Sequence, residues 1–352
     1  MDETLNISTL TLSAELLNLV AEIDEFKGAW SAIGRIAPER LSALRRVATI
    51  ESIGSSTRIE GAQLSDREVE FLLRNLDISS FASRDEEEVV GYAEVMELVF
   101  QSWENLALTE NHIKQLHRDL LKYSSKDSRH RGEYKKNPNH VEAFGADGKS
   151  KGIVFATATP FDTPRLMTEL VSWTAACLKR RNLHPLLVIA VFIVVFLEIH
   201  PFQDGNGRLS RILTTLLLLK SGYYYVPYSS LESVVEQTKE SYFRALRMTQ
   251  GTLRSDSPNW NPWILYFLQS LQQQKRRLET KMNREEKLLS NLPELSITIL
   301  DYVKQHGRVT VSEVAELTGV SRNTVKDHLK KLTGRQQLVR HGAGRGTWYS
   351  LS

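Results

Sequence analysis

The sequence predicts a mainly α-helical protein, a helical bundle that carries one β-hairpin and is followed by a small, separate C-terminal domain. Apolar residues recur at helical spacing through residues 11–50 and again from 64 to about 120. Two strongly apolar segments, Leu186–Leu197 and Ile212–Leu219, have the composition of buried helices. Strand-like alternation is confined to about residues 140–160, around the turn signal Asp147-Gly148.

Composition narrows the class of protein. The chain has 352 residues, enough for two or three domains, and is 41% hydrophobic and 25% charged, as in ordinary globular proteins. The single cysteine, Cys177, excludes an intramolecular disulfide and a cysteine-rich metal site. The run Leu186–Leu197 is shorter than the roughly 18 apolar residues of a membrane span, and we identify no signal peptide. We therefore expect a soluble, cytoplasmic protein without a membrane partner.

Local signals place the individual helices. Ser65 and Glu68 form a capping-box pattern at the start of a helix over about 64–77, and Thr109 is a candidate N-cap. A helical stretch covers 86–103, and helices resume at Arg165 and continue to about residue 250. Asn261, followed by proline, is the expected cap of a helix that runs into a charged segment.

These signals divide the chain into four parts. We expect an N-terminal helical region over 1–105, a core domain over 106–270, a helical connector over 271–293 and the last domain over 294–352. The hairpin belongs to the core domain.

The twelve residues His200–Arg211 place polar, flexible sequence between the two apolar segments. Gly205 and Gly207 tolerate positive φ, so we expect consecutive amides to point into one concavity. They lead into a helix N-terminus expected near Arg208, where unpaired N–H groups favour an anion. Arg208 and Arg211 are three residues apart and project from one side of that turn, a set of donors suited to phosphate oxygens.

Two further side chains of this loop have the chemistry of phosphoryl transfer. Asp204 is a hard carboxylate of the kind that binds Mg²⁺ beside phosphates. His200 is the only nearby side chain that takes up a proton near neutral pH. A lone histidine before proline more often caps a helix, and an arginine pair in a first helical turn usually faces solvent. Their combination within twelve residues is what indicates a polyphosphate site with a general base.

The same twelve residues resemble the Fic family motif, HPFx(D/E)GNGRxxR, with no departure at a fixed position. Fic proteins are mostly helical and transfer AMP from ATP to a hydroxyl group of a protein. The resemblance implies that His200 deprotonates a Ser, Thr or Tyr of the target and that Asp204 holds Mg²⁺ (or Mn²⁺). It also implies that the phosphates of ATP are held by Gly205, Asn206, Gly207, Arg208 and Arg211.

A second match lies upstream, in residues 56–61. Ser56, Glu60 and Gly61 resemble the inhibitory motif (S/T)xxxE(G/N) of Fic proteins that are restrained by an N-terminal helix. Ser-x-x-x-Glu is common on any helix, so this pattern gains meaning only beside the intact first motif. The resemblance implies that Glu60 pairs with Arg211 and removes the donor that the γ-phosphate of ATP needs.

The hairpin resembles the Fic flap, whose exposed edge holds the target segment by strand addition; a simple surface hairpin is the alternative. Residues outside the loop also correspond to nucleotide-contacting positions of the family, with a glutamine at the last of them where asparagine is common. These residues are Phe155, Ala156 and Thr157 in the flap, and Tyr242, Phe243 and Gln250 downstream.

The last domain has the order helix, turn, helix and hairpin, which is typical of a winged helix-turn-helix. Residues 294–352 contain nine Lys or Arg and five Asp or Glu, a net charge of +4, whereas the whole chain carries +3. An anionic partner is therefore expected here, although winged helices also serve as protein-interaction modules. The candidate DNA-contacting residues are Arg322, Asn323, Lys326, Lys330, Arg340 and Arg345.

Taken together, the sequence favours an ATP-dependent protein adenylyltransferase that Glu60 autoinhibits and that modifies a target protein or itself. Removal of AMP from modified protein by the same site is an alternative. Another alternative is a DNA-binding regulator whose Fic domain senses a nucleotide, although a sensor would not need His200. A homodimer is left open by the sequence.

Overall fold

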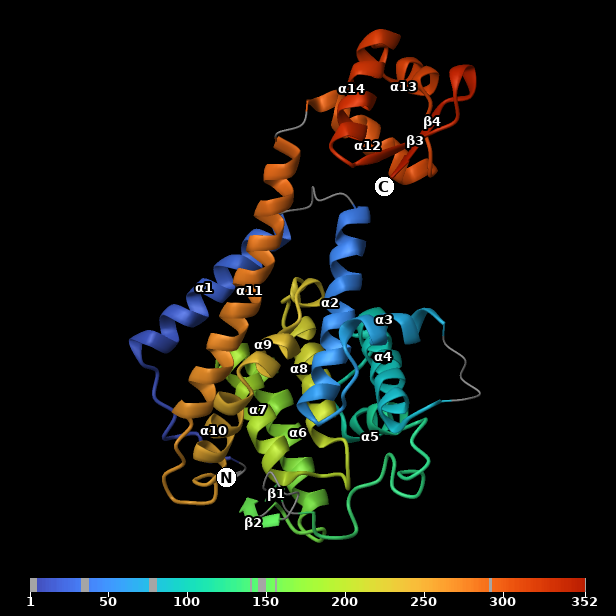
Figure 1. The fold of residues 1–352 in the computed structure, drawn as a ribbon. Helices are drawn as coiled ribbons and strands as arrows, with labels where there is room; N and C mark the ends of the chain where they lie inside the picture. The colour runs from blue at the N-terminus through green and yellow to red at the C-terminus, as the bar shows by residue number, and fades with distance from the viewer. Residues whose placement is uncertain are drawn as a thin grey trace. The chain divides into compact units, whose positions relative to one another are not determined.

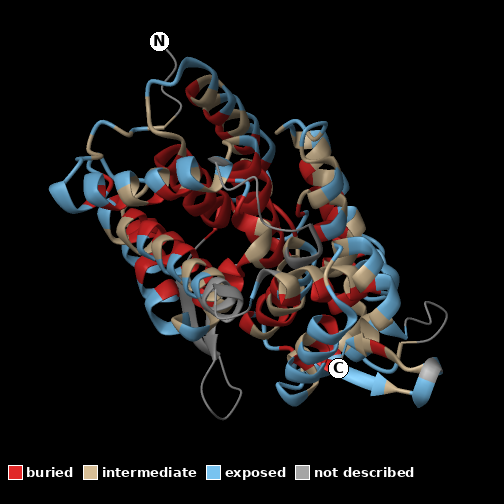
Figure 2. Cartoon of the chain, turned by 90° about the horizontal axis from the view of Figure 1, so that it is seen from above, coloured by how far each residue is buried: buried red, intermediate tan, exposed pale blue. Residues whose placement is uncertain are grey.

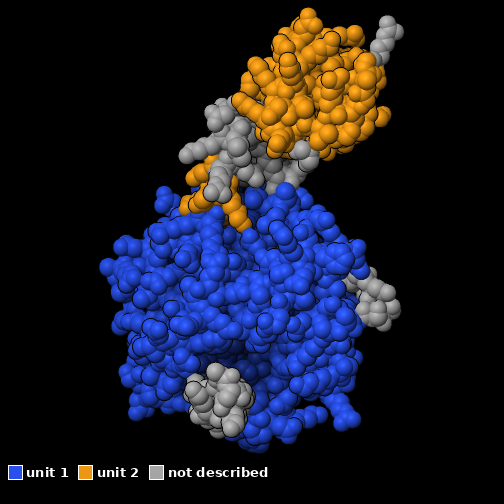
Figure 3. All heavy atoms as spheres, viewed as in Figure 1, with its two compact units in different colours: residues 1–277 blue, residues 278–352 orange. Residues whose placement is uncertain are grey.

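The computed structural model describes residues 5–32, 38–75, 81–139, 141–144, 150–155, 157–290 and 293–351. The protein is mainly α-helical, as the sequence predicts (Figure 1). It divides into two compact units, residues 1–277 and 278–352, which Figure 3 colours separately. Each unit is described by itself below.

Helices make up most of the first unit. Ser65 caps α3 through the predicted capping box with Glu68, and the Thr109 side chain caps α5, because both supply an oxygen to an otherwise unpaired N–H group. The unit contains α1 (Ala14–Ala32), α2 (Pro38–Ile59), α3 (Asp66–Arg74), α4 (Arg84–Ser102), α5 (Glu110–Leu120), α6 (Thr163–Arg180), α7 (Pro185–Ile199), α8 (Asn206–Lys220), α9 (Leu231–Gln237), α10 (Lys239–Gln250) and most of α11 (Asn261–Ser290).

The core of the first unit forms around α7. Every residue from Leu186 to Ile199 is buried, because this helix is apolar on all faces and must be surrounded. Helices α6, α8 and α10 pack against it, and the buried positions are red in Figure 2. Trp263 of α11 donates its indole N–H to the Ala190 carbonyl at 2.7 Å. Within the described residues, no helix is both long and apolar enough to cross a membrane.

The predicted hairpin is present as two antiparallel strands, β1 (Val141–Phe144) and β2 (Ser150–Phe155). Val141 pairs with Phe155 and Phe144 with Ser150, and the register shifts twice between these ends. The expected turn at Asp147-Gly148 lies outside the described residues. One boundary differs from the expectation, since α11 includes Asn261 as its first residue and is not capped by it.

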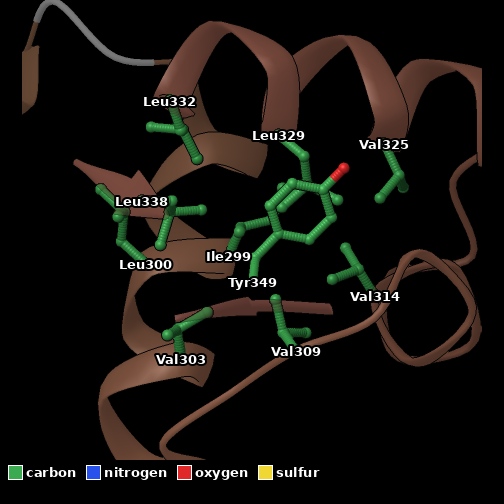
Figure 4. Packing of buried hydrophobic residues seen from close by; sticks show 10 residues of the cluster. All are labelled: Ile299, Leu300, Val303, Val309, Val314, Val325, Leu329, Leu332, Leu338 and Tyr349. Carbon is green, nitrogen blue, oxygen red and sulfur yellow. The ribbon is translucent and has the colours of Figure 1, made fainter. Parts of the chain in front are cut away.

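The second unit has the predicted order of elements around its own core. It contains the end of α11, then α12 (Glu294–His306), α13 (Val311–Thr318), α14 (Arg322–Gly334), β3 (Leu338–His341) and β4 (Trp348–Leu351). Strands β3 and β4 pair antiparallel. The Tyr349 ring lies among aliphatic side chains from all three helices, including Ile299, Val314 and Leu329 (Figure 4). Ser321 caps α14, as predicted.

Candidate active site

The loop of interest joins α7 to α8. His200 directly follows α7 with φ 53° and ψ 59°. Residues other than glycine adopt this left-handed backbone conformation only at a cost in energy. Helix α8 begins at Asn206, two residues before the expected start near Arg208, with Gly205 at φ 78° as its N-cap. Residues 200–205 therefore form a tight connection between two buried helices.

Asn206 and His117 hold this loop in shape. The Asn206 amide accepts a hydrogen bond from the Phe202 N–H at 2.9 Å and donates to the Phe202 carbonyl at 2.7 Å. Its side chain is thus used to close the loop, whereas the family resemblance led us to expect a phosphate contact. His117 is fully buried, stacks on the Phe202 ring at 3.8 Å and lies 3.0 Å from the Asp204 carbonyl through Nε2.

The geometry around His200 leaves it ready to act as a base. Burial lowers the pKa of His200 to about 4, so the imidazole is neutral near pH 7. Its Nδ1 lies 3.3 Å from the Leu197 carbonyl, and a carbonyl can only accept. We assign the proton to Nδ1 on this ground, which leaves Nε2 with a free lone pair.

Arg211 is held by Ser56 of α2 and by Glu60, the residue that follows this helix. Its Nε donates to the Ser56 hydroxyl at 2.8 Å, and Nη2 donates to the Ser56 carbonyl at 3.0 Å and to Glu60 at 2.7 Å. The ion pair expected from the second motif is therefore present. The third nitrogen, Nη1, is buried and has no hydrogen-bond partner among the described residues. Arg211 is 7% exposed, so these contacts operate largely away from water.

The Glu60 carboxylate lies against Gly207. A Cβ atom at Gly207 would be 2.2 Å from Glu60 Oε1, so any other residue would oblige the flexible Glu60 side chain to shift. Gly207 was expected to adopt positive φ, as Gly205 does, but it has ordinary helical backbone. Burial raises the pKa of Glu60, but the charge of Arg211 outweighs it and holds that pKa below its ordinary value. An anion thus already occupies the α8 N-terminus.

The spacing of Arg208 and Arg211 suggested that both would contact one acceptor, but Arg208 contacts different groups. It is 2% exposed and lies between two carboxylates, 3.0 Å from Glu88 of α4 and 3.3 Å from Asp204. Arg84 of α4 also contacts both, at 2.8 Å from Glu88 and 3.0 Å from Asp204. These four side chains form a closed ring of alternating charge, which we call the α4–α8 ring.

Asp204 is the residue that could hold a divalent cation. Its side chain is 36% exposed, and the charge of Arg208 and the Gly205 N–H bond outweigh burial and hold its pKa below the ordinary value. Mg²⁺ in proteins is commonly bound by one or two carboxylates together with phosphates of the substrate. The single carboxylate therefore fits an ion that arrives with a nucleotide. The described residues contain no cluster of three metal-ligating side chains.

The remaining predicted nucleotide residues lie at different depths. Tyr242 is 5% exposed and lines a small, mostly apolar cavity together with Arg211 and Trp263. Phe243 is 36% exposed and Gln250 is buried at the end of α10. The Thr157 side chain is buried and hydrogen bonded within the protein, while Ala156 and the Phe155 side chain lie outside the described residues.

Sequence reasoning missed several residues that shape the site. His117, Lys135 and Asn139 hold the loop, and Arg84 with Glu88 closes the α4–α8 ring. No local pattern marks them, because each acts through a contact between segments distant in the chain. Only the polar segment that contains Lys135 and Asn139, between a helix and the hairpin, hinted at a role.

In the second unit, the candidate DNA-contacting side chains of α14 point to solvent. Arg322, Asn323, Lys326 and Lys330 are exposed, and so is Arg340 of β3. The Arg345 side chain lies outside the described residues. Helix α14 buries Val325, Leu329 and Leu332 on its opposite face.

Comparison with known families agrees with this geometry. Residues 107–218 match the Fic/DOC family, and residues 292–334 match a winged helix-turn-helix DNA-binding family. The chain contains a Fic/DOC domain. The domain match includes α5, the hairpin, α7 and nearly all of α8, and thus the whole loop from His200 to Arg211.

Relatives of this Fic domain occur among curated proteins and solved structures. The protein adenylyltransferase Fic of Drosophila mojavensis is 29% identical over 241 residues, 67% of this chain and 43% of that protein. The corresponding values for Drosophila willistoni are 29%, 67% and 44%. The chain thus spans less than half the length of these curated relatives.

Two solved structures share the fold. A Fic domain containing signaling protein from Bacteroides thetaiotaomicron is 26% identical with a TM-score of 0.58, covering 74% of this chain and 97% of that one. A Fic family protein from Desulfovibrio desulfuricans is 22% identical with a TM-score of 0.64, covering 97% of both chains.

Proposed function

We propose that the Fic domain transfers AMP from ATP to a hydroxyl group of a protein and that Glu60 restrains this activity. The observation that carries the proposal is the arrangement around the α8 N-terminus. A neutral imidazole, the partly exposed Asp204 carboxylate and an arginine with a nitrogen that lacks a partner among the described residues lie around a position that an anion, Glu60, already occupies. The adenylyltransferase relatives support the same activity.

The proposed reaction uses groups already in place. His200 Nε2 takes the proton of the target hydroxyl, whose oxygen forms a bond to the α-phosphorus of ATP. The bond between the α-phosphorus and its bridging oxygen breaks, and pyrophosphate leaves. Amides at the α8 N-terminus and Arg211 are positioned to neutralise charge on the phosphates. A divalent cation on Asp204 would supply further neutralisation of phosphate charge.

Autoinhibition would follow from competition for Arg211. In the structure, Nε and Nη2 of Arg211 are used by Ser56 and Glu60, and the Glu60 carboxylate lies where a phosphate would approach Gly207. A phosphate must displace this carboxylate or bind in another pose. Arg211 is buried and the Glu60 side chain is 36% exposed, so this bidentate-capable pair is partly shielded from water and can compete with a phosphate group.

The decisive experiment compares AMP transfer by the wild type and Glu60→Gly, using α-labelled ATP, Mg²⁺ and either a lysate or the protein alone. We expect Glu60→Gly to raise labelling tenfold or more, which corresponds to a coupling of about 1.4 kcal/mol. Gln63→Gly, a glycine substitution at an exposed position nearby, should leave labelling unchanged. His200→Ala in the Glu60→Gly background should abolish labelling while ATP affinity stays within a few-fold.

A second substitution separates inhibition from a general structural effect. Arg211→Ala should not activate, because the γ-phosphate then lacks its donor, and Glu60→Gly combined with Arg211→Ala should behave like Arg211→Ala alone. If Glu60→Gly leaves transfer unchanged or lowers it while ATP still binds, autoinhibition by Glu60 is wrong. If no variant labels any protein, the transferase activity itself is wrong.

For the second unit we propose DNA binding. The exposed cations and Asn323 of α14, on a winged helix-turn-helix with a net charge of +4 in residues 294–352, support it.

A further inference from the structure

Residues 135–139 run alongside the end of α7 and satisfy four consecutive carbonyl groups there. The Lys135 ammonium donates to the Ile199 carbonyl at 2.9 Å, and the Lys135 backbone N–H donates to the Pro201 carbonyl at 2.8 Å. The Asn139 amide donates to the carbonyls of His200, at 3.3 Å, and Phe202, at 2.6 Å. The backbone on both sides of His200 is thus held by one short segment.

The same ammonium also holds both ends of the hairpin segment. Besides Ile199, the Lys135 Nζ donates to Asn139 Oδ1 at 2.9 Å and to Thr157 Oγ1 at 3.0 Å. Asn139 directly precedes residues 140–156, and Thr157 directly follows them. The Thr157 hydroxyl in turn donates to Asn139 Oδ1 at 3.1 Å. All three donors of one lysine therefore link the hairpin ends to the residue before His200.

Burying the charged ammonium of Lys135 costs free energy that neutral acceptors offset only in part. Lys135 is 3% exposed, and its three acceptors are neutral. Burial lowers the pKa of Lys135 to about 8, while the nearby Glu198 carboxylate of α7 raises it and Arg254, beyond α10, lowers it. His200 meanwhile has the left-handed backbone described above. A strained residue keeps its conformation only when surrounding contacts over-determine it, and Lys135 and Asn139 supply those contacts.

We propose that Lys135 is a positioning residue, which couples the ends of the hairpin to the backbone of His200 so that a target hydroxyl and the base are held in register. Among the described residues it forms no hydrogen bond to the His200 ring, and it acts through the backbone carbonyls of Ile199 and Pro201. The kinetic part of this inference rests on the proposed AMP transfer; the structural part does not.

The kinetic test uses Lys135→Met in the Glu60→Gly background, with Lys136→Met as the matched control at an exposed neighbouring lysine. We expect Lys135→Met to lower kcat at least tenfold while the Kd of ATP stays within threefold, because the nucleotide site is intact and the base is misaligned; loss of the Lys135 charge, which lowers the pKa of His200, would by itself make the imidazole a stronger base. Lys136→Met should match its parent. A kcat within twofold of the parent, or ATP affinity that falls in proportion to kcat, overturns the proposal.

The pH profile adds a readout that a merely structural role would not change. Lys135 loses a proton as the pH rises through about 8, and the neutral amine has two donors for three acceptors. The parent should therefore lose activity above pH 8, a decline that Lys135→Met should lack. An identical decline in both proteins would count against Lys135.

Hydrogen exchange tests the coupling without any activity. Amides of residues 199–206 should exchange at least tenfold faster in Lys135→Met than in Lys136→Met; equal exchange overturns the proposal even if transfer is confirmed. Should Lys135→Met fail to fold, Thr157→Val removes one acceptor of Lys135 and one donor to Asn139 with little change in volume. It should accelerate exchange at residues 199–206 in the same direction, by a smaller factor, and unchanged exchange in this variant also overturns the proposal.

Discussion

At the scale of single residues, the site depends on buried polar groups whose hydrogen bonds are completed by distant segments. His117 is the clearest case. Its Nδ1 accepts the Gly132 N–H at 2.8 Å, so Nε2 carries the proton and donates to the Asp204 carbonyl. A protonated ring would have no acceptor for the Nδ1 hydrogen, because the Gly132 N–H already points there. The neutral ring is thus part of the loop's structure.

This requirement predicts a loss of stability in acid. Burial lowers the pKa of His117 to about 4, whereas an unfolded histidine titrates near 6.5. Between these pH values His117 binds a proton in the unfolded chain but not in the folded protein. The contribution of the neutral ring to the unfolding free energy is therefore complete above pH 6.5 and is lost as the pH falls to about 4. We expect His117→Gln to remove on the order of 3 kcal/mol from the pH dependence of the unfolding free energy.

Urea unfolding followed by tryptophan fluorescence at pH values between 4 and 7 measures this effect. His112→Gln is the control, since His112 lies on the same helix but is only half-buried. A pH dependence that is unchanged in His117→Gln would contradict the neutral, buried ring.

At the scale of secondary-structure elements, α2 with the residue after it and α4 each contribute two side chains to the loop and first turn of α8. From α2 and the residue after it come Ser56 and Glu60, which hold Arg211. From α4 come Arg84 and Glu88, which complete the α4–α8 ring around Arg208 and Asp204. Asp204, Arg208 and Arg211 are therefore already paired inside the protein before any nucleotide is present. Two separate helices contribute to that state.

The ring predicts that Arg84 opposes binding of a cation at Asp204. Its guanidinium lies 3.0 Å from Asp204 Oδ2, the edge of the carboxylate that a metal ion would approach. Arg84→Ala should therefore bind Mn²⁺ at least threefold more tightly, as measured by the loss of the free-ion signal in electron paramagnetic resonance. Asp204→Ala should abolish the gain.

Lys126→Ala is the matched control for this prediction. Lys126 lowers the pKa of Asp204 through its charge, but among the described residues it forms no ion pair with Asp204. An equal gain in Arg84→Ala and Lys126→Ala would mean that general charge, and not the ring contact, governs the affinity.

At the scale of the whole molecule, two units with independent cores are joined in one chain. The second unit packs ten buried residues, Tyr349 and Val309 among them, into one hydrophobic cluster. The part of the chain for which we propose DNA binding therefore has a hydrophobic core of its own. Its exposed cations lie on α14, on the face opposite the buried Val325, Leu329 and Leu332.

If these cations contact phosphates, affinity for duplex DNA must fall steeply with salt, since each neutralised phosphate releases bound counterions. Binding of the full chain to a labelled duplex should give a linear fall of log K with log salt. Arg322→Ala combined with Lys326→Ala should reduce the slope by about 2, at about 0.9 per phosphate contact. Arg67→Ala, an exposed arginine of the first unit, should not change it.

Fluorescence anisotropy across a salt series measures these slopes. If no duplex binds at low salt, including the protein's own promoter region, a protein-interaction role for the second unit takes the place of DNA binding.

Much of the fold could be read directly from local patterns. The caps Ser65, Thr109 and Ser321 occupy their predicted places, because an N-cap depends on residues within one turn of the helix. The burial of α7 follows from its composition, and the hairpin from alternation around a turn signal. The loop His200–Arg211 was found as a contiguous motif, since the groups it brings together are neighbours in the chain.

Other features depend on contacts between segments far apart, and no local pattern carries that information. Glu60 lies against Gly207, and the Asn206 side chain is hydrogen bonded to the Phe202 backbone. The burial of Lys135 and the partners of Arg84 follow from how helices and loops pack, because a buried donor must find an acceptor wherever the fold supplies one. Local sequence patterns identified the candidate groups of the site. Only the packing of distant segments decided which of these groups are paired or hydrogen bonded.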